Sequence, residues 1–288
     1  MVDCADIDAW LAAREAEVPN LRDGCSKSIV WAGKAGVQTD IAVLYIHGFS
    51  ATGHELRPLP DLVAMGLNAN LHFTRLTGHG QDGAAMGDAT FAAWRADVDE
   101  ALMVANTIGK RVLVIGCSTG CTLAVDALVR GAQISGLVCI SPNFGLFNKV
   151  AQLLLDLPLA KYWGPLVAGR TRSFDPINDG HAAYWTTHYP TRAVFPMGEA
   201  VRAVRRADLS QVRTPAMFAF NISDQVVSAA ATQNVIDRWA GRMTVHGIMQ
   251  GPADDAMGHV MAGNVFSPGQ TKPLAAAILR WFGRLAPA

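Results

Sequence analysis

The residues with the clearest chemical potential form the pattern G-x-S-x-G at positions 116–120, with Ser118 at its centre. The pattern ends the apolar run 111–115 and leads directly into the amphipathic segment 119–131. A serine on such a sharp strand-to-helix turn lies beyond the end of a sheet, and its small neighbours allow the close packing that the turn requires. Ser118 is therefore a candidate nucleophile for acyl transfer.

A serine hydroxyl is a weak nucleophile near pH 7, so it needs a base and a group that orients the base. Asp224 follows the strand-like run 216–221, and His259 lies in the loop after the next run, 243–248. The chain order serine, acid, histidine suits a nucleophile on a strand–turn–helix. Asp254 and Asp255 compete for the role of the acid, but they share a loop with His259, and the chain order favours Asp224.

A tetrahedral intermediate also needs donors for its oxyanion. The strand-like run 41–46 is followed by His47-Gly48-Phe49-Ser50. We expect the backbone N–H of Phe49 to pair with that of Thr119 as the oxyanion donors, and we interpret His47 as a structural residue of this turn.

These side chains must be positioned by an α/β architecture. Short β-branched runs alternate with longer amphipathic segments, which predicts a mostly parallel sheet flanked by helices. The predicted strands are 28–32, 41–46, 71–76, 111–115, 134–141, 216–221 and 243–248, and the predicted helices are 51–66, 90–108, 119–131, 229–240 and 272–285. Parallel strands end at one edge of a sheet, so Ser118, Asp224 and His259 should converge there.

One interval interrupts this alternation. Residues 143–212 contain apolar helical stretches but no convincing strand, and a structureless loop of this length would be unusual in a compact domain. We therefore expect an inserted helical cap at 143–212, a core formed by 41–142 and 213–288, and an N-terminal helix with the first strands in 1–40.

From about residue 41 to its end, the chain resembles the serine α/β-hydrolases. HGFS at 47–50 together with LTGHG at 76–80 resembles the monoacylglycerol lipase and carboxylesterase branch. The resemblance implies an α/β-hydrolase fold, with Ser118 as nucleophile, His259 as base, Asp224 as its orienter, and Phe49 and Thr119 as oxyanion donors. The N-terminal forty residues and the cap match no motif of the family, so the substrate-binding residues stay unknown beyond a contribution from the cap.

Two other patterns have simpler interpretations. Residues 78–83 fit G-x-G-x-x-G, but a dinucleotide site needs a helix that opens within the pattern, and the sequence postpones the helix to about Phe91. Cys117 and Cys121 form C-x₃-C, which is no standard metal spacing. We expect no cofactor and no metal. The five cysteines suit a reducing compartment, although a Cys4–Cys25 bridge stays open.

The composition excludes several classes of protein. The 288 residues include 24 basic and 24 acidic side chains, and this zero net charge argues against nucleic acid as a partner. The N-terminus lacks the basic start of a signal peptide, and no apolar stretch approaches the ~20 residues of a membrane span. We expect a cytoplasmic protein, or an extracytoplasmic one if a leader preceded Met1.

These features predict hydrolysis of a carboxylic ester through an acyl-enzyme on Ser118. The apolar cap should favour a small apolar ester with a medium or long hydrocarbon chain. Thioester, lactone, amide and carbon–carbon hydrolysis remain open on the same residues, as does a non-catalytic ligand sensor. The oligomeric state is not predictable from the sequence.

Overall fold

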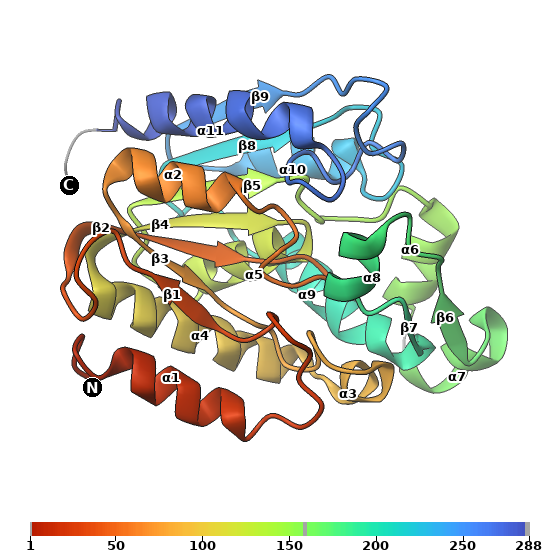
Figure 1. Cartoon of the computed structure of the whole chain (residues 1–288). Coiled ribbons are helices and arrows are strands. Elements are labelled where there is room, and N and C mark those ends of the chain that lie inside the picture. The colour runs from red at the N-terminus through yellow and green to blue at the C-terminus, as the bar shows by residue number, and fades with distance from the viewer. Residues whose placement is uncertain (1, 158–159, 286–288) are drawn as a thin grey trace.

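The computed structural model describes residues 2–157 and 160–285 of the chain. Within them, seven strands form one sheet in the order β1-β3-β2-β4-β5-β8-β9, with a second, two-stranded sheet outside it (Figure 1). The strands of the large sheet are β1 (Ser28–Val30), β2 (Thr39–Ile46), β3 (Asn70–Phe73), β4 (Gly109–Cys117), β5 (Gly136–Ile140), β8 (Ala216–Phe220) and β9 (Met243–Gly247). Only β1 is antiparallel to its neighbour, so the predicted α/β class with a mostly parallel sheet is confirmed.

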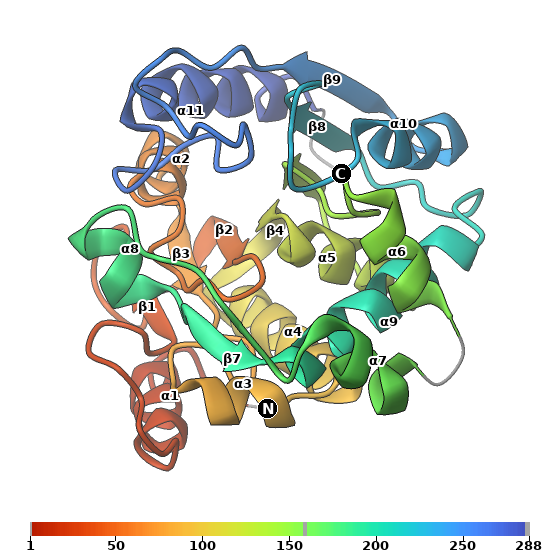
Figure 2. The same ribbon diagram turned by 90° about the vertical axis from the view of Figure 1, so that its right-hand side faces the viewer.

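Helices cover both faces of this sheet (Figure 2). One face carries α2 (Leu59–Leu67) and α11 (Pro268–Phe282), and the other carries α4 (Phe91–Ile108), α5 (Thr119–Val129) and α10 (Ala229–Arg238). The central strands are buried on both sides, and β5 has no exposed residue. This explains why they read as continuous apolar runs rather than as alternating ones.

The N-terminal segment forms α1 (Ile7–Ala16), which lies beside the sheet edge that β1 occupies (Figure 1). A short helix, α3 (Gly83–Asp88), was not predicted, because Gly and Ala at 83–87 have no clear apolar period. The side chain of Asp82 caps it by accepting the N–H of Ala85.

Between β5 and β8 the chain leaves the sheet. This segment contains α6 (Lys149–Asp156), α7 (Ala160–Ala168), β6 (Thr171–Ser173), α8 (Asp179–Tyr184), β7 (His188–Pro190), the 3₁₀ turn η1 (Thr191–Ala193) and α9 (Val194–Arg206). The elements from α6 to η1 stand beyond the carboxyl ends of the strands, whereas α9 packs against α5 and so continues into the helical layer.

The expectation that residues 143–212 contain no strand is wrong in one respect. β6 and β7 pair antiparallel, with Arg172 opposite Tyr189. Each has three residues, which is too short for alternation to be visible in the sequence.

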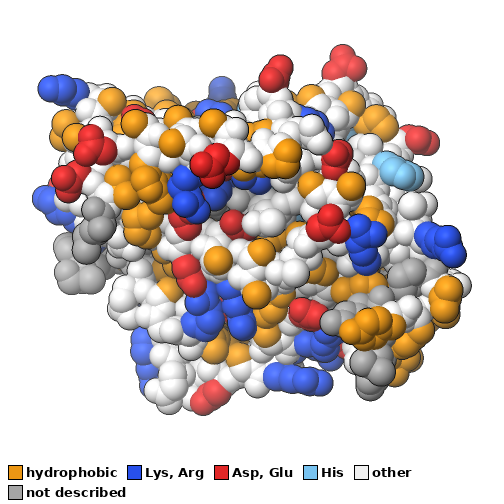
Figure 3. Space-filling view, turned by 90° about the horizontal axis from the view of Figure 1, so that it is seen from below, with side chains coloured by type: hydrophobic (Ala, Val, Ile, Leu, Met, Phe, Trp, Pro, Cys, Tyr) orange, Lys and Arg blue, Asp and Glu red, His pale blue; other side chains and the backbone are white. Residues whose placement is uncertain are grey.

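Charged side chains of both signs are interspersed on the face seen in Figure 3, and hydrophobic side chains gather at the end that carries the cap. The exposed hydrophobic residues of the inserted segment 143–212 include Phe147, Val150, Leu153, Leu157, Tyr162, Leu166 and Val167. Among the residues that the structure describes, no helix is both long and apolar enough to span a bilayer.

Candidate active site

Ser118 lies on the turn between β4 and α5, with φ 49° and ψ −113°. This left-handed conformation is unfavourable for a residue with a Cβ and persists only where the surrounding structure holds it. A Cβ at Gly120 would lie 2.0 Å from the carbonyl oxygen of Ile46, and one at Gly116 would lie 2.8 Å from the N of Cys121. Both positions therefore require glycine, as the sequence pattern implied.

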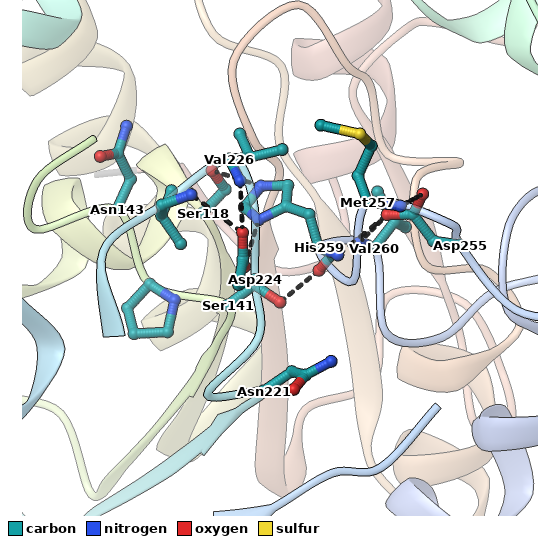
Figure 4. Close-up of polar contacts among 12 residues, drawn as sticks. Ser118, Ser141, Asn143, Asn221, Asp224, Val226, Asp255, Met257, His259 and Val260 are labelled. Atoms are coloured by element: carbon teal, nitrogen blue, oxygen red, sulfur yellow. Dashed lines mark hydrogen bonds and ion pairs between the residues drawn. The ribbon is translucent and has the colours of Figure 1, made fainter. Parts of the chain in front are cut away.

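Ser118, His259 and Asp224 come from three different loops and form one chain of hydrogen bonds (Figure 4). The Nε2 atom of His259 is 3.1 Å from Ser118 Oγ, and its Nδ1 atom is 2.8 Å from Asp224 Oδ2. All three are buried, with 6%, 9% and 2% of their surfaces exposed. The structure thus brings together the three residues that the sequence singled out.

Asp224 is held by its own loop. Its Oδ1 atom accepts the N–H of Val226 at 2.7 Å and that of Val227 at 2.9 Å, which leaves Oδ2 for the imidazole. A carboxylate cannot donate, so Nδ1 of His259 carries the proton in this bond and Nε2 is free to accept from the serine hydroxyl.

The environment of His259 favours its protonated form. Burial lowers the pKa of the imidazole, but the hydrogen bond and charge of Asp224, with the charges of Glu55 and Asp255, raise it overall. His259 is therefore a stronger base than an ordinary histidine.

Asp255 has a different role from the one considered for it in the sequence. Its Oδ2 atom accepts the N–H of His259 at 2.9 Å and that of Val260 at 2.7 Å, and its Oδ1 atom accepts the N–H of Met257. Asp254 instead accepts the N–H of Gly251. Asp255 holds the backbone of the loop, whereas Asp224 is the carboxylate bound to the imidazole.

The turn at residues 47–50 (the oxyanion turn) lies beside Ser118, because a Cβ at Gly48 would be 3.2 Å from Ser118 Cβ. The Thr119 N–H is the first of α5 and has no acceptor within that helix. Within the described part of the chain, the Phe49 N–H also donates no hydrogen bond. Both expected donors are thus unpaired in the structure.

His47 holds the oxyanion turn. It lies 2.8 Å from the Gly48 carbonyl through Nδ1, and it accepts the N–H of Leu76 through Nε2 at 3.1 Å. Burial lowers the pKa of His47 to about 4, so the ring is neutral, with the proton on Nδ1. This agrees with the structural role expected for it.

Two buried polar residues at the site did not stand out in the sequence. Ser141 follows β5 in a left-handed conformation, and its hydroxyl donates to the carbonyl oxygen of His259. Glu55 accepts two hydrogen bonds behind the oxyanion turn. Neither belongs to a spacing pattern, because tertiary packing alone brings them to the site.

A cavity of about 320 Å³ begins beside the site and extends under the cap. Phe49 and Val226 line it at the end near the loops that hold Ser118 and Asp224, while neither Ser118 nor His259 is part of its wall. Its remaining wall comes from the cap and is mostly apolar, formed by Leu146, Ala151, Leu154, Leu155, Trp163, Gly164, Val167, Arg172, Tyr189, Thr191, Val194, Phe195 and Met197.

Other parts of the protein occupy the space beside the glycines of the G-x-G-x-x-G pattern at 78–83. A Cβ at Gly83 would lie 2.1 Å from the carbonyl oxygen of His188, and one at Gly80 would lie 2.7 Å from Cys25 Cβ. The expectation that no helix opens within the pattern is wrong, since α3 begins at Gly83. The glycines nevertheless face backbone and side chains, so they do not form an open phosphate cradle.

The five cysteines are free thiols in the structure, including Cys4 and Cys25. Cys117 and Cys121 are fully buried beside the nucleophile turn. Across residues 2–157 and 160–285, no group of histidine, cysteine and acidic side chains has the arrangement of a metal site.

Comparisons with known proteins agree with this geometry. Residues 43–285 match the model of the alpha/beta hydrolase family. A thermostable monoacylglycerol lipase of Bacillus sp. (strain H-257) is 33% identical over 187 residues, which cover 65% of this chain and 72% of that protein.

Solved structures of lipolytic enzymes share the fold. A structure described under the metagenome-derived lipolytic enzymes LipS and LipT has a TM-score of 0.74 at 17% identity, covering 92% of this chain and 99% of that one. A soluble variant of monoglyceride lipase from Saccharomyces cerevisiae has a TM-score of 0.67 at 14% identity, covering 94% and 96%. The resemblance predicted from the sequence is thus confirmed, and the chain belongs to the alpha/beta hydrolase family.

Proposed function

We propose that this protein hydrolyses carboxylic esters through an acyl-enzyme on Ser118. The observation that carries the proposal is the continuous chain of hydrogen bonds from Ser118 through His259 to Asp224. An apolar cavity lies next to it, with Phe49 and Val226 in its wall. The lipases and esterases among its relatives support the same reaction class.

The reaction proceeds in two halves. As Ser118 Oγ attacks the ester carbonyl, Nε2 of His259 takes the hydroxyl proton, and the N–H groups of Phe49 and Thr119 stabilise the oxyanion. The imidazolium then donates this proton to the leaving alcohol. Water, deprotonated by the same nitrogen, hydrolyses the acyl-enzyme and restores the serine.

The substrate class follows from the cavity. About 320 Å³ with a mostly apolar wall suits a hydrocarbon chain better than a sugar or a phosphate. We therefore propose esters of medium- or long-chain acids, of which a monoacylglycerol is one, in line with the named activity of the Bacillus relative. Thioesters, lactones and amides need the same machinery and are tested as competing substrates.

The proposal is tested by treating the protein with a fluorophosphonate and weighing it intact. We expect one covalent adduct on the native protein and none on Ser118→Ala. No adduct would contradict the proposal and favour a hydrolase-like scaffold that binds a ligand without turnover. An adduct that survives Ser118→Ala would also contradict it, because the probe would then react with another residue.

A series of p-nitrophenyl esters tests the substrate class separately. We expect activity to rise from acetate to octanoate or beyond, because longer chains bury more apolar surface in the cavity. Activity that peaks at acetate and vanishes by octanoate would contradict the acyl-chain assignment while leaving the esterase activity intact.

A further inference from the structure

A second carboxylate lies beside the active site. Glu55 follows the oxyanion turn and is 3% exposed. Within the described ranges it forms no ion pair with a cationic side chain, unlike the buried Glu15, which pairs with Arg75 at 2.8 Å. Burying a carboxylate without a cation is costly, so its hydrogen bonds must compensate for that cost.

The hydrogen bonds that Glu55 accepts from Tyr45 and Gly48 fall on one oxygen, and the side chain of Cys117 also interacts with the carboxylate. Glu55 Oε2 accepts the O–H of Tyr45 at 2.8 Å and the N–H of Gly48 at 2.7 Å. Tyr45 is fully buried in β2, the strand that leads into the oxyanion turn. The carboxylate therefore ties the start of the turn to the strand beneath it.

Two contacts of Gly48 fix the orientation of its backbone in the turn. The Gly48 N–H is held by Glu55, and the Gly48 carbonyl is held by His47 Nδ1 at 2.8 Å. In a trans peptide the C=O and the next N–H point in opposite directions. With Gly48 held on both sides, the Phe49 N–H points away from the His47 ring.

Gly48 lies close to both Glu55 and Ser118. A Cβ at Gly48 would lie 2.6 Å from Glu55 Oε1 and 3.2 Å from Ser118 Cβ. Gly48 therefore has no room for a side chain, and its lack of a Cβ lets both Glu55 and Ser118 approach the turn.

We propose that Glu55 is a positioning residue for the oxyanion turn. Its carboxylate fixes the Gly48 N–H, and together with His47, which fixes the Gly48 carbonyl, it holds the Phe49 N–H toward the carbonyl that Ser118 attacks. Its negative charge also acts on the imidazole of His259. This inference rests on the esterase function proposed above.

The charge makes the proposal testable by pH. His259 is faced by the carboxylates of Asp224, Glu55 and Asp255, and Glu55 is faced by Tyr45 and Cys117 as well as by His259. Burial raises the pKa of Glu55 above its usual value, and the hydrogen bonds of the carboxylate offset this rise only in part. The negative charge of Glu55 helps to raise the pKa of His259, so removing it should lower that pKa.

Two substitutions separate the hydrogen bonds from the charge. Glu55→Ala leaves the Gly48 N–H without its acceptor, and we expect kcat to fall by ~10-fold or more, toward the ~10²–10³ loss of one oxyanion donor. KM should change by less than about threefold, because the interaction matters most in the transition state. Glu55→Gln keeps an acceptor oxygen, so it should restore most of kcat while moving the acid limb of kcat/KM to lower pH.

Glu15→Gln is the matched control, since it changes another buried glutamate that binds Arg75 and the Lys27 N–H instead of the oxyanion turn. It should lower the unfolding temperature but leave kcat and the acid limb unchanged. A folded Glu55→Ala protein with native kcat, or a Glu55→Gln protein whose acid limb stays in place, would overturn the proposal.

If Glu55→Ala does not fold, the test rests on the isosteric Glu55→Gln variant. The pH at which its kcat/KM falls on the acid side then supports or overturns the proposal. Measurements on the native protein distinguish a failure of the proposed function from a failure of this inference. Absence of esterase activity and of a Ser118 adduct refutes the proposed function, whereas native activity with unaffected Glu55 variants refutes only this inference.

Discussion

His259 has each ring nitrogen next to a different partner, 2.8 Å from Asp224 and 3.1 Å from Ser118. This arrangement requires the neutral ring to carry its proton on Nδ1. The chemistry at the scale of single residues therefore depends on one protonation equilibrium.

The acid limb of the pH profile follows from that equilibrium. Only neutral His259 can take the serine proton, so kcat/KM should fall as the pH drops through its pKa, which is raised above the usual value of about 6.5. Initial rates with a short p-nitrophenyl ester between pH 5 and 9 measure this limb. A limb below the ordinary histidine value would contradict the assignment.

Asp224→Asn provides the contrast for this measurement. It removes the charge that opposes the effect of burial. The amide oxygen stays with the N–H groups of Val226 and Val227, so an NH2 donor replaces the acceptor that orients the ring. The limb should move to lower pH, and kcat should fall by an amount on the order of 10⁴, the loss seen when a triad acid becomes an amide.

At the scale of elements, helix α1 is attached to the core by a buried ion pair. Arg75 follows β3 and binds Glu15 of α1 through Nε and Nη2, both at 2.8 Å, and Glu15 also accepts the Lys27 N–H. Both side chains are nearly inaccessible, with 7% and 5% of their surfaces exposed.

Removing one partner of this ion pair should therefore destabilise the folded protein. Glu15→Ala leaves the Arg75 guanidinium buried without its counter-charge, and we expect the free energy of unfolding to fall by about 3–5 kcal/mol. Urea titration followed by circular dichroism measures the change. Glu17→Ala, at an exposed position one residue beyond the same helix, should change it by less than about 0.5 kcal/mol. Equal effects of the two substitutions would show that the ion pair does not anchor α1.

At the scale of the whole molecule, the cavity exists only between the cap and the core. Its wall combines Phe49 and Val226 of the core loops with residues of the inserted segment, such as Ala151 in α6. Under the proposed function, any preference for acyl chain length therefore depends on how the cap and the core assemble.

Filling this cavity should shift the preference. Ala151→Phe places a ring in the cavity, so the ratio of octanoate to butanoate hydrolysis should fall by about tenfold or more. The same substitution at Ala182, an exposed position of α8 outside the cavity wall, should leave the ratio unchanged. An unchanged ratio for Ala151→Phe would place the acyl chain elsewhere.

Elements with a strong period were predictable, and short ones were not. All seven strands of the large sheet were predicted, with ends displaced by up to three residues. Helix 51–66 was predicted too long, since α2 begins only at Leu59, after the turns that contain Glu55. β6, β7 and α3 are too short to show a hydrophobic period, so nothing in the sequence marked them.

The sequence by itself determined the nucleophile turn, the order of serine, acid and histidine, and the parallel architecture that brings them to one edge. These depend on local backbone requirements and on periodicity, which are written in consecutive residues. Only the tertiary structure decided which carboxylate meets the imidazole, that Asp255 holds a loop instead, and that Glu55 lies behind the oxyanion turn. Those facts depend on distances between side chains far apart in the chain, and no local pattern encodes such distances.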